Sequence, residues 1–190
     1  MTNLSELKKM EVISADGHVI GRVQSVIITD KWAISGLSIK MKKETLEMLG
    51  KKKPFLSSLY LDVNINEISG VKDKVVLRHS MKELGTYLLS HNTKFDAERL
   101  IDLEVLGVGG KVVGKVEDMK IDMSLWKIPS LVIKIRKDAL EMMKMKKCLI
   151  CNTQLNVSMN HVVDVGDYVM LEVTAENIGQ ILENISIKKG

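Results

Sequence analysis

Residues 11–40, EVISADGHVIGRVQSVIITDKWAISGLSIK, recur in a similar form later in the chain, and this repeat determines the architecture. From residue 103 the chain reads LEVLGVGGKVVGKVEDMKIDMSLWKIPSLVIKI, and the two stretches align along their length with one residue added near Met123. The matched positions include glycines, β-branched residues and a tryptophan: Gly17 with Gly110, Gly21 with Gly114, Val23 with Val116, Trp32 with Trp126 and Ile39 with Ile133. Self-similarity at a fixed spacing identifies a structural repeat. We therefore predict two domains of one fold, residues 1–92 and 97–190.

The composition is that of an ordinary globular protein, with 45% hydrophobic and 27% charged residues. No apolar run approaches the ~18 residues of a membrane-spanning helix. The first residues, MTNLSELKKMEV, lack the basic and then apolar pattern of a signal peptide. We therefore expect a cytoplasmic protein with a core of its own.

The formal net charge of +4 is unevenly distributed along the chain. Residues 1–95 carry 15 Lys and Arg against 10 Asp and Glu, whereas residues 96–190 carry 13 against 14. The surplus of the first half is smaller than nucleic-acid-binding domains usually carry. Opposite signs on two similar domains favour head-to-tail association.

Period-two alternation of apolar residues predicts that each copy is mainly β. In the first copy we expect strands at 9–13, 18–29, 33–41, 55–63 and 74–77. Ser14-Ala15-Asp16-Gly17 has the composition of a hairpin turn. Gly21 lies within a predicted strand, where glycine marks a bend or a close backbone approach. We therefore interpret the glycines of the repeat as structural.

Two short helices are predicted in each copy, between and after these strands. Residues 44–49 end at a glycine, and Ser80 with Glu83 forms a capping box that opens a helix to about residue 90. The second copy repeats them at 138–145 and 174–183, and residues 1–8 look like a loose polar lead-in. The predicted fold is two tandem small antiparallel β-barrels, each with a short inserted helix and a C-terminal helix.

The glycine pattern resembles a known family. The motif G-x-x-x-G-x-V begins at Gly17 and again at Gly110, and V-G-D-x-V-x-L, which contains Gly166, closes the second copy at residues 165–171. Both motifs resemble PRC-barrel domains, although Lys72 takes the place of Gly166 in the first copy. A chain of two such domains is similar to the archaeal PRC-barrel proteins of the CdpB type.

This resemblance implies a protein that binds other proteins and has no catalytic residues, cofactor or metal. It implies an adaptor of archaeal FtsZ-based cell division that binds SepF and is recruited to the division site at the membrane. It also implies self-association, as a homo-oligomer or as a hetero-oligomer with a paralogue. The alternative is an RNA- or ribosome-associated maturation factor, because RimM also contains a PRC barrel.

The residues with reactive or metal-binding side chains form no recognisable catalytic or metal-binding set in the sequence. Cys148 and Cys151 form a single C-x-x-C, whereas a structural zinc site needs four ligands. We expect idle or buried thiols there. The four histidines are scattered along the chain without a nucleophile motif nearby. The sequence therefore favours a binding protein over an enzyme.

Two segments are candidates for partner contact. The lysines of KMKKETLEMLGKKK, residues 40–53, could meet an anionic surface or simply face solvent, and no aromatic residue lies among them to stack on bases. The methionines of DALEMMKMKK, residues 138–147, suit adaptable protein contacts, although methionine also fills cores. The candidate partner-binding residues are Lys51, Lys52, Lys53, Met142, Met143 and Met145.

Overall fold

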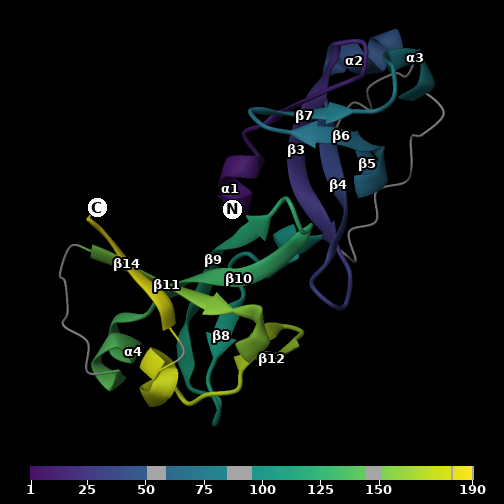
Figure 1. Cartoon of the computed structure of the whole chain (residues 1–190). Helices are drawn as coiled ribbons and strands as arrows, with labels where there is room; N and C mark the ends of the chain where they lie inside the picture. Colours follow the sequence, from purple (N-terminus) through teal and green to yellow (C-terminus); the bar gives the residue numbers. More distant parts are fainter. Residues whose placement is uncertain (51–58, 85–95, 144–150, 181, 190) are drawn as a thin grey trace. The chain divides into compact units, whose positions relative to one another are not determined.

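The structure is a computed structural model, and it describes residues 1–50, 59–84, 96–143, 151–180 and 182–189. The chain forms two compact units (Figure 1). Unit 1 comprises Met1–Glu98 and Asp122–Lys127, and unit 2 comprises Arg99–Ile121 and Ile128–Gly190. Both units consist mainly of strands with a few short helices, so the predicted β class is confirmed.

Unit 1 is built on a six-stranded sheet with the strand order β5-β4-β3-β2-β7-β6 among its described residues. The elements are β1 (Thr2–Asn3), α1 (Leu4–Leu7), β2 (Glu11–Ile13), β3 (Val19–Ile28), β4 (Ile34–Met41), α2 (Lys43–Met48), β5 (Tyr60–Asn64), the 3-10 turn η1 (Ile65–Glu67), β6 (Ile68–Val71), β7 (Lys74–Leu77) and α3 (Met81–Leu84). All neighbouring strands are antiparallel except β2 and β7.

Unit 2 repeats this order and adds one strand, giving β12-β13-β8-β9-β10-β11-β14 in its described part. The elements are β8 (Glu104–Leu106), β9 (Val112–Asp122), β10 (Lys127–Ile135), α4 (Lys137–Met142), β11 (Cys151–Ser158), η4 (Met159–His161), β12 (Val162–Val165), β13 (Tyr168–Leu171), η5 (Ala175–Gln180) and β14 (Leu182–Lys189); η3 (Ala97–Leu100) precedes β8. Strands β8 and β13 form the parallel pair, as β2 and β7 do in unit 1.

The predicted closed barrels are not confirmed, because the pairing order of each sheet has two ends in the described residues. In unit 1 the free ends are β5 and β6, which are adjacent in sequence. Residues 65–67 form a 3-10 turn between them, capped by the Asn64 side chain that accepts from Asn66 N–H. This turn redirects the chain, so β6 pairs with β7 instead of continuing beside β5.

Two equivalent glycines allow the first two long strands of each unit to cross closely. A Cβ atom on Gly21 would lie 2.1 Å from the Lys40 carbonyl oxygen, and one on Gly114 would lie 2.2 Å from the Lys134 carbonyl oxygen. Real Cβ atoms do not approach backbone oxygens so closely. The repeated glycines therefore sit where β3 meets β4 and where β9 meets β10.

The core of each unit lies on the inner side of its sheet. In unit 1, Val12, Val26 and Leu37 are fully buried, and a register shift near Gln24 places the apolar residues before and after it on the same side. The first residues are not the loose lead-in that the sequence suggested. Leu4 and Leu7 of α1 are buried, because their spacing puts both side chains on one helix face that packs on β3.

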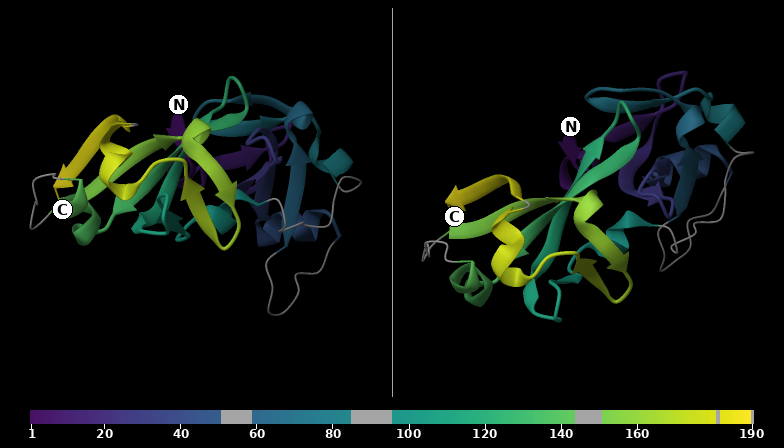
Figure 2. Two further views of the ribbon diagram at one scale, coloured as in Figure 1. Left: turned by 90° about the horizontal axis from the view of Figure 1, so that it is seen from below. Right: turned by 60° about the horizontal axis from the view of Figure 1, so that its bottom comes forward.

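The closing segment of unit 2 differs from the helix predicted at 174–183. The helical part is the 3-10 turn η5, and the chain then continues as β14 alongside β11 (Figure 2). The sequence from Ile185 to Ile187 alternates apolar and polar residues, which favours a strand. In unit 1 the matching helix begins as α3, and its predicted remainder lies outside the described residues.

None of the helices in the described ranges is long and apolar enough to span a membrane.

Candidate functional site

A row of polar and charged side chains crosses the outer face of unit 1. Cross-strand pairing places Lys74 beside Glu11, Glu11 beside Arg22, Arg22 beside Lys40 and Lys40 beside Tyr60. Neighbours in such a row project from the same face of a sheet. Arg22 and Lys40 are exposed. The row therefore spans five strands of the solvent-facing side.

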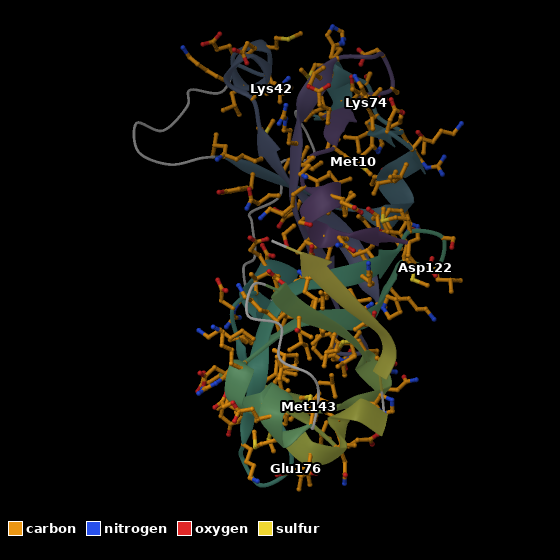
Figure 3. The ribbon with its side chains drawn as sticks, turned by 90° about the vertical axis from the view of Figure 1, so that its left-hand side faces the viewer. Met10, Lys42, Lys74, Asp122, Met143 and Glu176 are labelled. Carbon is orange, nitrogen blue, oxygen red and sulfur yellow. The ribbon has the colours of Figure 1, made fainter. Side chains whose placement is uncertain are left out.

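Glu11 is held between Lys74 of this row and Lys42, which follows β4. Its carboxylate accepts from Lys74 Nζ at 3.1 Å and from Lys42 Nζ at 3.2 Å, and Figure 3 labels both lysines. These two ammonium groups, Lys74 first, lower the pKa of Glu11 below its usual value. We call Arg22, Lys40, Lys42, Lys74 and Glu11 the cation cluster of unit 1. Its four cations and one carboxylate give a net charge of +3.

Two members of the cation cluster are like charges placed directly opposite each other. Arg22 on β3 pairs in register with Lys40 on β4, and neither forms an ion pair within the described part of the chain. Like charges at directly opposite positions destabilise a sheet. The cluster therefore retains an arrangement that folding alone does not favour.

Unit 2 contains the same arrangement at the equivalent positions. The Arg136 N–H donates to the Val113 carbonyl at 3.0 Å, as Lys42 N–H donates to the Ile20 carbonyl in unit 1. This bond fixes the antiparallel alignment of β9 and β10 and places Lys115 opposite Lys134. A pair of facing cations thus occurs in both units.

Additional acidic or neutral groups reduce the charge on this face of unit 2. Tyr168 takes the place of Lys74 next to the glutamate of the row, Glu104. Glu117 lies where unit 1 has Gln24, and it accepts from the Gln154 side chain. The corresponding face of unit 2 therefore carries fewer unneutralised cations than the cation cluster of unit 1.

The free edge strands of the two units differ as well. β12 ends the unit 2 sheet and exposes Val163, with 66% of its surface accessible, and Tyr168 on the neighbouring β13 is 43% accessible. The matching residue of β6 in unit 1 is Ser69, whose hydroxyl donates to the Val76 carbonyl at 3.1 Å. Open strand edges can pair with another chain. The edge of unit 2 is thus the more apolar of the two.

The structure places only part of the predicted partner-binding set. Met142 is half-buried in the last turn of α4, and Met143 caps that helix, which contacts η5; Figure 3 labels Met143 and Glu176 of η5. The other four candidates lie outside the described residues: Lys51, Lys52, Lys53 and Met145. Cys148 also lies outside them, and only the backbone of Cys151 is described.

The predicted turn glycines occupy two kinds of position. Gly17 and Gly110 adopt positive φ angles of 84° and 76°, which glycine adopts without strain. Gly166 has no such angle, and a Cβ atom there would meet nothing within 4 Å. In the first turn, the Ser14 hydroxyl and then the Met81 N–H, opposed by partial burial, together lower the pKa of Asp16 to about 2.

Three of the described histidines lie beside a carboxylate, and the first is His18, whose Nδ1 lies 3.3 Å from Asp16 Oδ2. His79 pairs with Glu67, and His161 Nδ1 lies 2.5 Å from Glu172 Oε1. Among the described residues, no three His, Cys, Asp or Glu side chains come together as a metal site requires.

Sequence reasoning identified Lys40 and Lys42 within a basic segment but missed Arg22, Lys74 and Glu11. The available signal was the repeat itself, since Arg22 aligns with Lys115 and Lys40 with Lys134. Aligned cations at alternating strand positions indicate a shared outer face.

No protein-family model matches this chain, and no curated protein matches its sequence.

Proposed function

We propose that this protein is a non-enzymatic adaptor built of two PRC-type barrels. In this proposal it acts in archaeal FtsZ-based cell division, binds SepF and associates with further copies of itself or a paralogue. The observation that carries the proposal is the repeated sheet with an exposed outer face and a free edge in each unit. The cell-division role rests on the resemblance of the Gly17 and Gly110 motifs to the PRC-barrel family.

The glycine crossings support the barrel part of the proposal. A small barrel needs sharply bent, closely approaching strands, and Gly21 and Gly114 permit such an approach. Closure of the unit 1 sheet would require β5 and β6, the strands before and after η1, to approach each other. The open pairing order is therefore compatible with a partly open barrel.

The edge strands support self-association. Val163 on β12 is exposed and apolar, and the outer edge of this strand, which has no partner in the described sheet, offers backbone donors and acceptors to a second chain. A charge on an edge strand prevents such pairing. Val163→Lys should therefore convert oligomers to smaller species. Ser69→Lys on β6 is the matched control variant in unit 1.

The test of the adaptor function is a pull-down of SepF from the same organism by the purified protein at low and high salt. Light scattering on the eluate gives the size of the complex. The proposal predicts stoichiometric capture that persists at high salt, because an apolar interface depends little on ionic strength. Absence of capture at both salt concentrations would contradict it.

The net charge of +3 on the cation cluster of unit 1 is the observation behind the second candidate, an RNA- or ribosome-associated factor, although the cluster contains no aromatic side chain on which bases stack. Phosphate contacts give affinities that fall steeply with added salt. If this candidate is correct, nucleic acid co-purifies with the protein and is lost at high salt, and SepF is not captured.

A further inference from the structure

We propose that the cation cluster of unit 1 docks an extended acidic segment of a partner protein, with carboxylates at alternate residues. This inference rests on the proposed adaptor function, to which it adds a second contact with an acidic segment of the partner. This contact weakens with added salt, whereas the apolar interface keeps the partner bound. One carboxylate of the segment lies between Arg22 and Lys40, and the next lies beside Lys42.

The spacing of the cations matches such a segment. Lys40 is in β4, and Lys42 follows with extended backbone angles, φ −74° and ψ 154°. Alternate residues of an extended chain are about 7 Å apart and project from the same face. The carboxylates at alternate residues of an extended peptide have the same spacing. A peptide lying along β4 can therefore meet both lysines in one register.

The cluster already binds one carboxylate in this way. Glu11 lies between Lys42 and Lys74, with oxygen-to-nitrogen distances of 3.2 and 3.1 Å. Arg22 and Lys40 form the neighbouring pair of cations in the same row, and Glu11, on the other side of Arg22, pairs with Lys42 and Lys74. A carboxylate from a partner would occupy that position as Glu11 occupies its own.

The facing cations of unit 1 are best explained by such a ligand. Arg22 and Lys40 repel each other in the free protein, and an anion placed between them turns this repulsion into attraction. An arginine and a lysine offer both the planar fork and the point charge that carboxylates accept.

The row is poorly suited to nucleic acid. Proteins that bind single strands combine cations with several aromatic side chains on which bases stack. Tyr60 is the single aromatic residue of the row, and it lies at its end, beside Lys40. Carboxylates need no stacking surface, so the chemistry of the row favours an acidic peptide.

The test measures binding of fluorescent peptides to the full chain by anisotropy. One peptide alternates glutamate with threonine, and a second has the same composition with all glutamates in one block. The alternating peptide should bind more tightly to the wild type. The double variant Arg22→Gln, Lys40→Gln should weaken its binding about tenfold, since each exposed ion pair contributes a few-fold.

Unit 2 provides the matched control. Lys115→Gln, Lys134→Gln removes the equivalent facing cations, and it should change the affinity for the alternating peptide less than about twofold, because acidic and neutral neighbours already reduce the charge there. Both double variants remove repulsion from an exposed face, so their unfolding temperatures should equal or exceed that of the wild type. Reduced binding of the unit 1 variant therefore does not reflect unfolding.

Three results would overturn the inference. The first is that the two peptides bind the wild type with equal affinity, or that the two double variants lose the same amount of affinity for the alternating peptide. The second is tighter binding of a single-stranded RNA oligonucleotide that depends on Arg22 and Lys40, which would assign the site to nucleic acid. The third is co-sedimentation with phosphatidylglycerol vesicles that depends on the same two residues, which would assign it to a membrane surface.

The peptide experiment and the SepF pull-down fail independently. Binding of the alternating peptide without capture of SepF removes the division role and leaves the acidic-segment site. Capture of SepF that is unchanged in Arg22→Gln, Lys40→Gln, together with no peptide binding, removes the site and leaves the adaptor function.

Discussion

Unit 1 and unit 2 share their strand order and their glycine crossings but differ in the chemistry of their surfaces. The positions that set the backbone, such as Gly21 and Gly114, are the same in both. The positions that face solvent have diverged, so that Lys74 of unit 1 corresponds to Tyr168 of unit 2. The same fold therefore carries two different surfaces, and the charge on unit 1 is the basis for proposing it as the unit that binds an anionic partner.

The first turns of the two units reach the same shape by different means. In unit 1 the Asp16 carboxylate accepts from the Ser14 hydroxyl and the Met81 N–H. In unit 2 the position of Ser14 is Gly107, where a Cβ atom would lie 2.8 Å from Ala175 N. One turn is thus held by a charged hydrogen-bond network and the other by close backbone packing.

The largest expected effect is at the glycine crossings. Gly21→Ala and Gly114→Ala should each lower the free energy of unfolding by about 3 kcal/mol, because the new Cβ would overlap a backbone carbonyl. Chemical denaturation measures this loss. Gly70→Ala is the control, since a Cβ there meets nothing within 4 Å. An equal loss in the control would show that the close crossing is not the cause.

A comparable effect is expected at the short turns that precede the two sheets. Leu7 of α1 aligns with Leu100 of η3, and both are buried. Leu7→Ala and Leu100→Ala should each cost about 3 kcal/mol through the cavity that they create. Met48→Ala, at a side chain that is 58% exposed, should cost less than about 0.5 kcal/mol. If chemical denaturation showed that Leu7→Ala lowers the free energy of unfolding as little as Met48→Ala does, this would contradict the packing of α1 on β3.

Acid should affect unit 1 through its first turn. The pKa of Asp16 is lowered from 3.8 to about 2 in the folded chain. Its stabilising contribution is therefore complete above the unfolded pKa and is lost as the pH falls from about 4 towards 2. Asp16→Asn should remove this part of the pH dependence. Tryptophan fluorescence can follow it, since Trp32 and Trp126 both belong to unit 1. An unchanged acid profile would exclude the Asp16 network as its source.

The smallest effect is expected from the acid within the cation cluster. Glu11→Gln should raise the affinity for the alternating glutamate peptide about two- to threefold, because Lys42 and Lys74 become available to the ligand. Glu104→Gln in unit 2 should leave that affinity unchanged. Anisotropy at low salt compares the two, and a decrease on Glu11→Gln would contradict the role given to the lysines.

The sequence repeat was sufficient to predict the two sheets, because aligned glycines and alternating apolar residues specify strands and their crossings. The repeat did not predict α1, because Leu4 and Leu7 stand among polar residues in the sequence. Their burial depends on contact with the folded sheet. The prediction that each sheet closes into a barrel was also not confirmed. Closure depends on how residues 65–67 turn the chain, and no periodicity encodes that direction.

The candidate site was predictable only in part. Lys40 and Lys42 stood out as a basic segment, whereas Arg22, Lys74 and Glu11 are isolated charges in the sequence. Cross-strand register brings them together, and the register at β3 includes a shift near Gln24 that strand alternation does not foresee. The positive φ angles of Trp32 and Trp126, 60° and 48°, are likewise visible only in the structure.

An amide NMR titration of the full chain with the alternating glutamate peptide can show whether unit 1 alone presents the anion-binding face. We expect the chemical-shift changes to concentrate on β3 and β4 around Arg22 and Lys40–Lys42, with little change on β9 and β10 around Lys115 and Lys134. Changes of equal size on both units, or changes confined to unit 2, would show that unit 1 is not the anion-binding side.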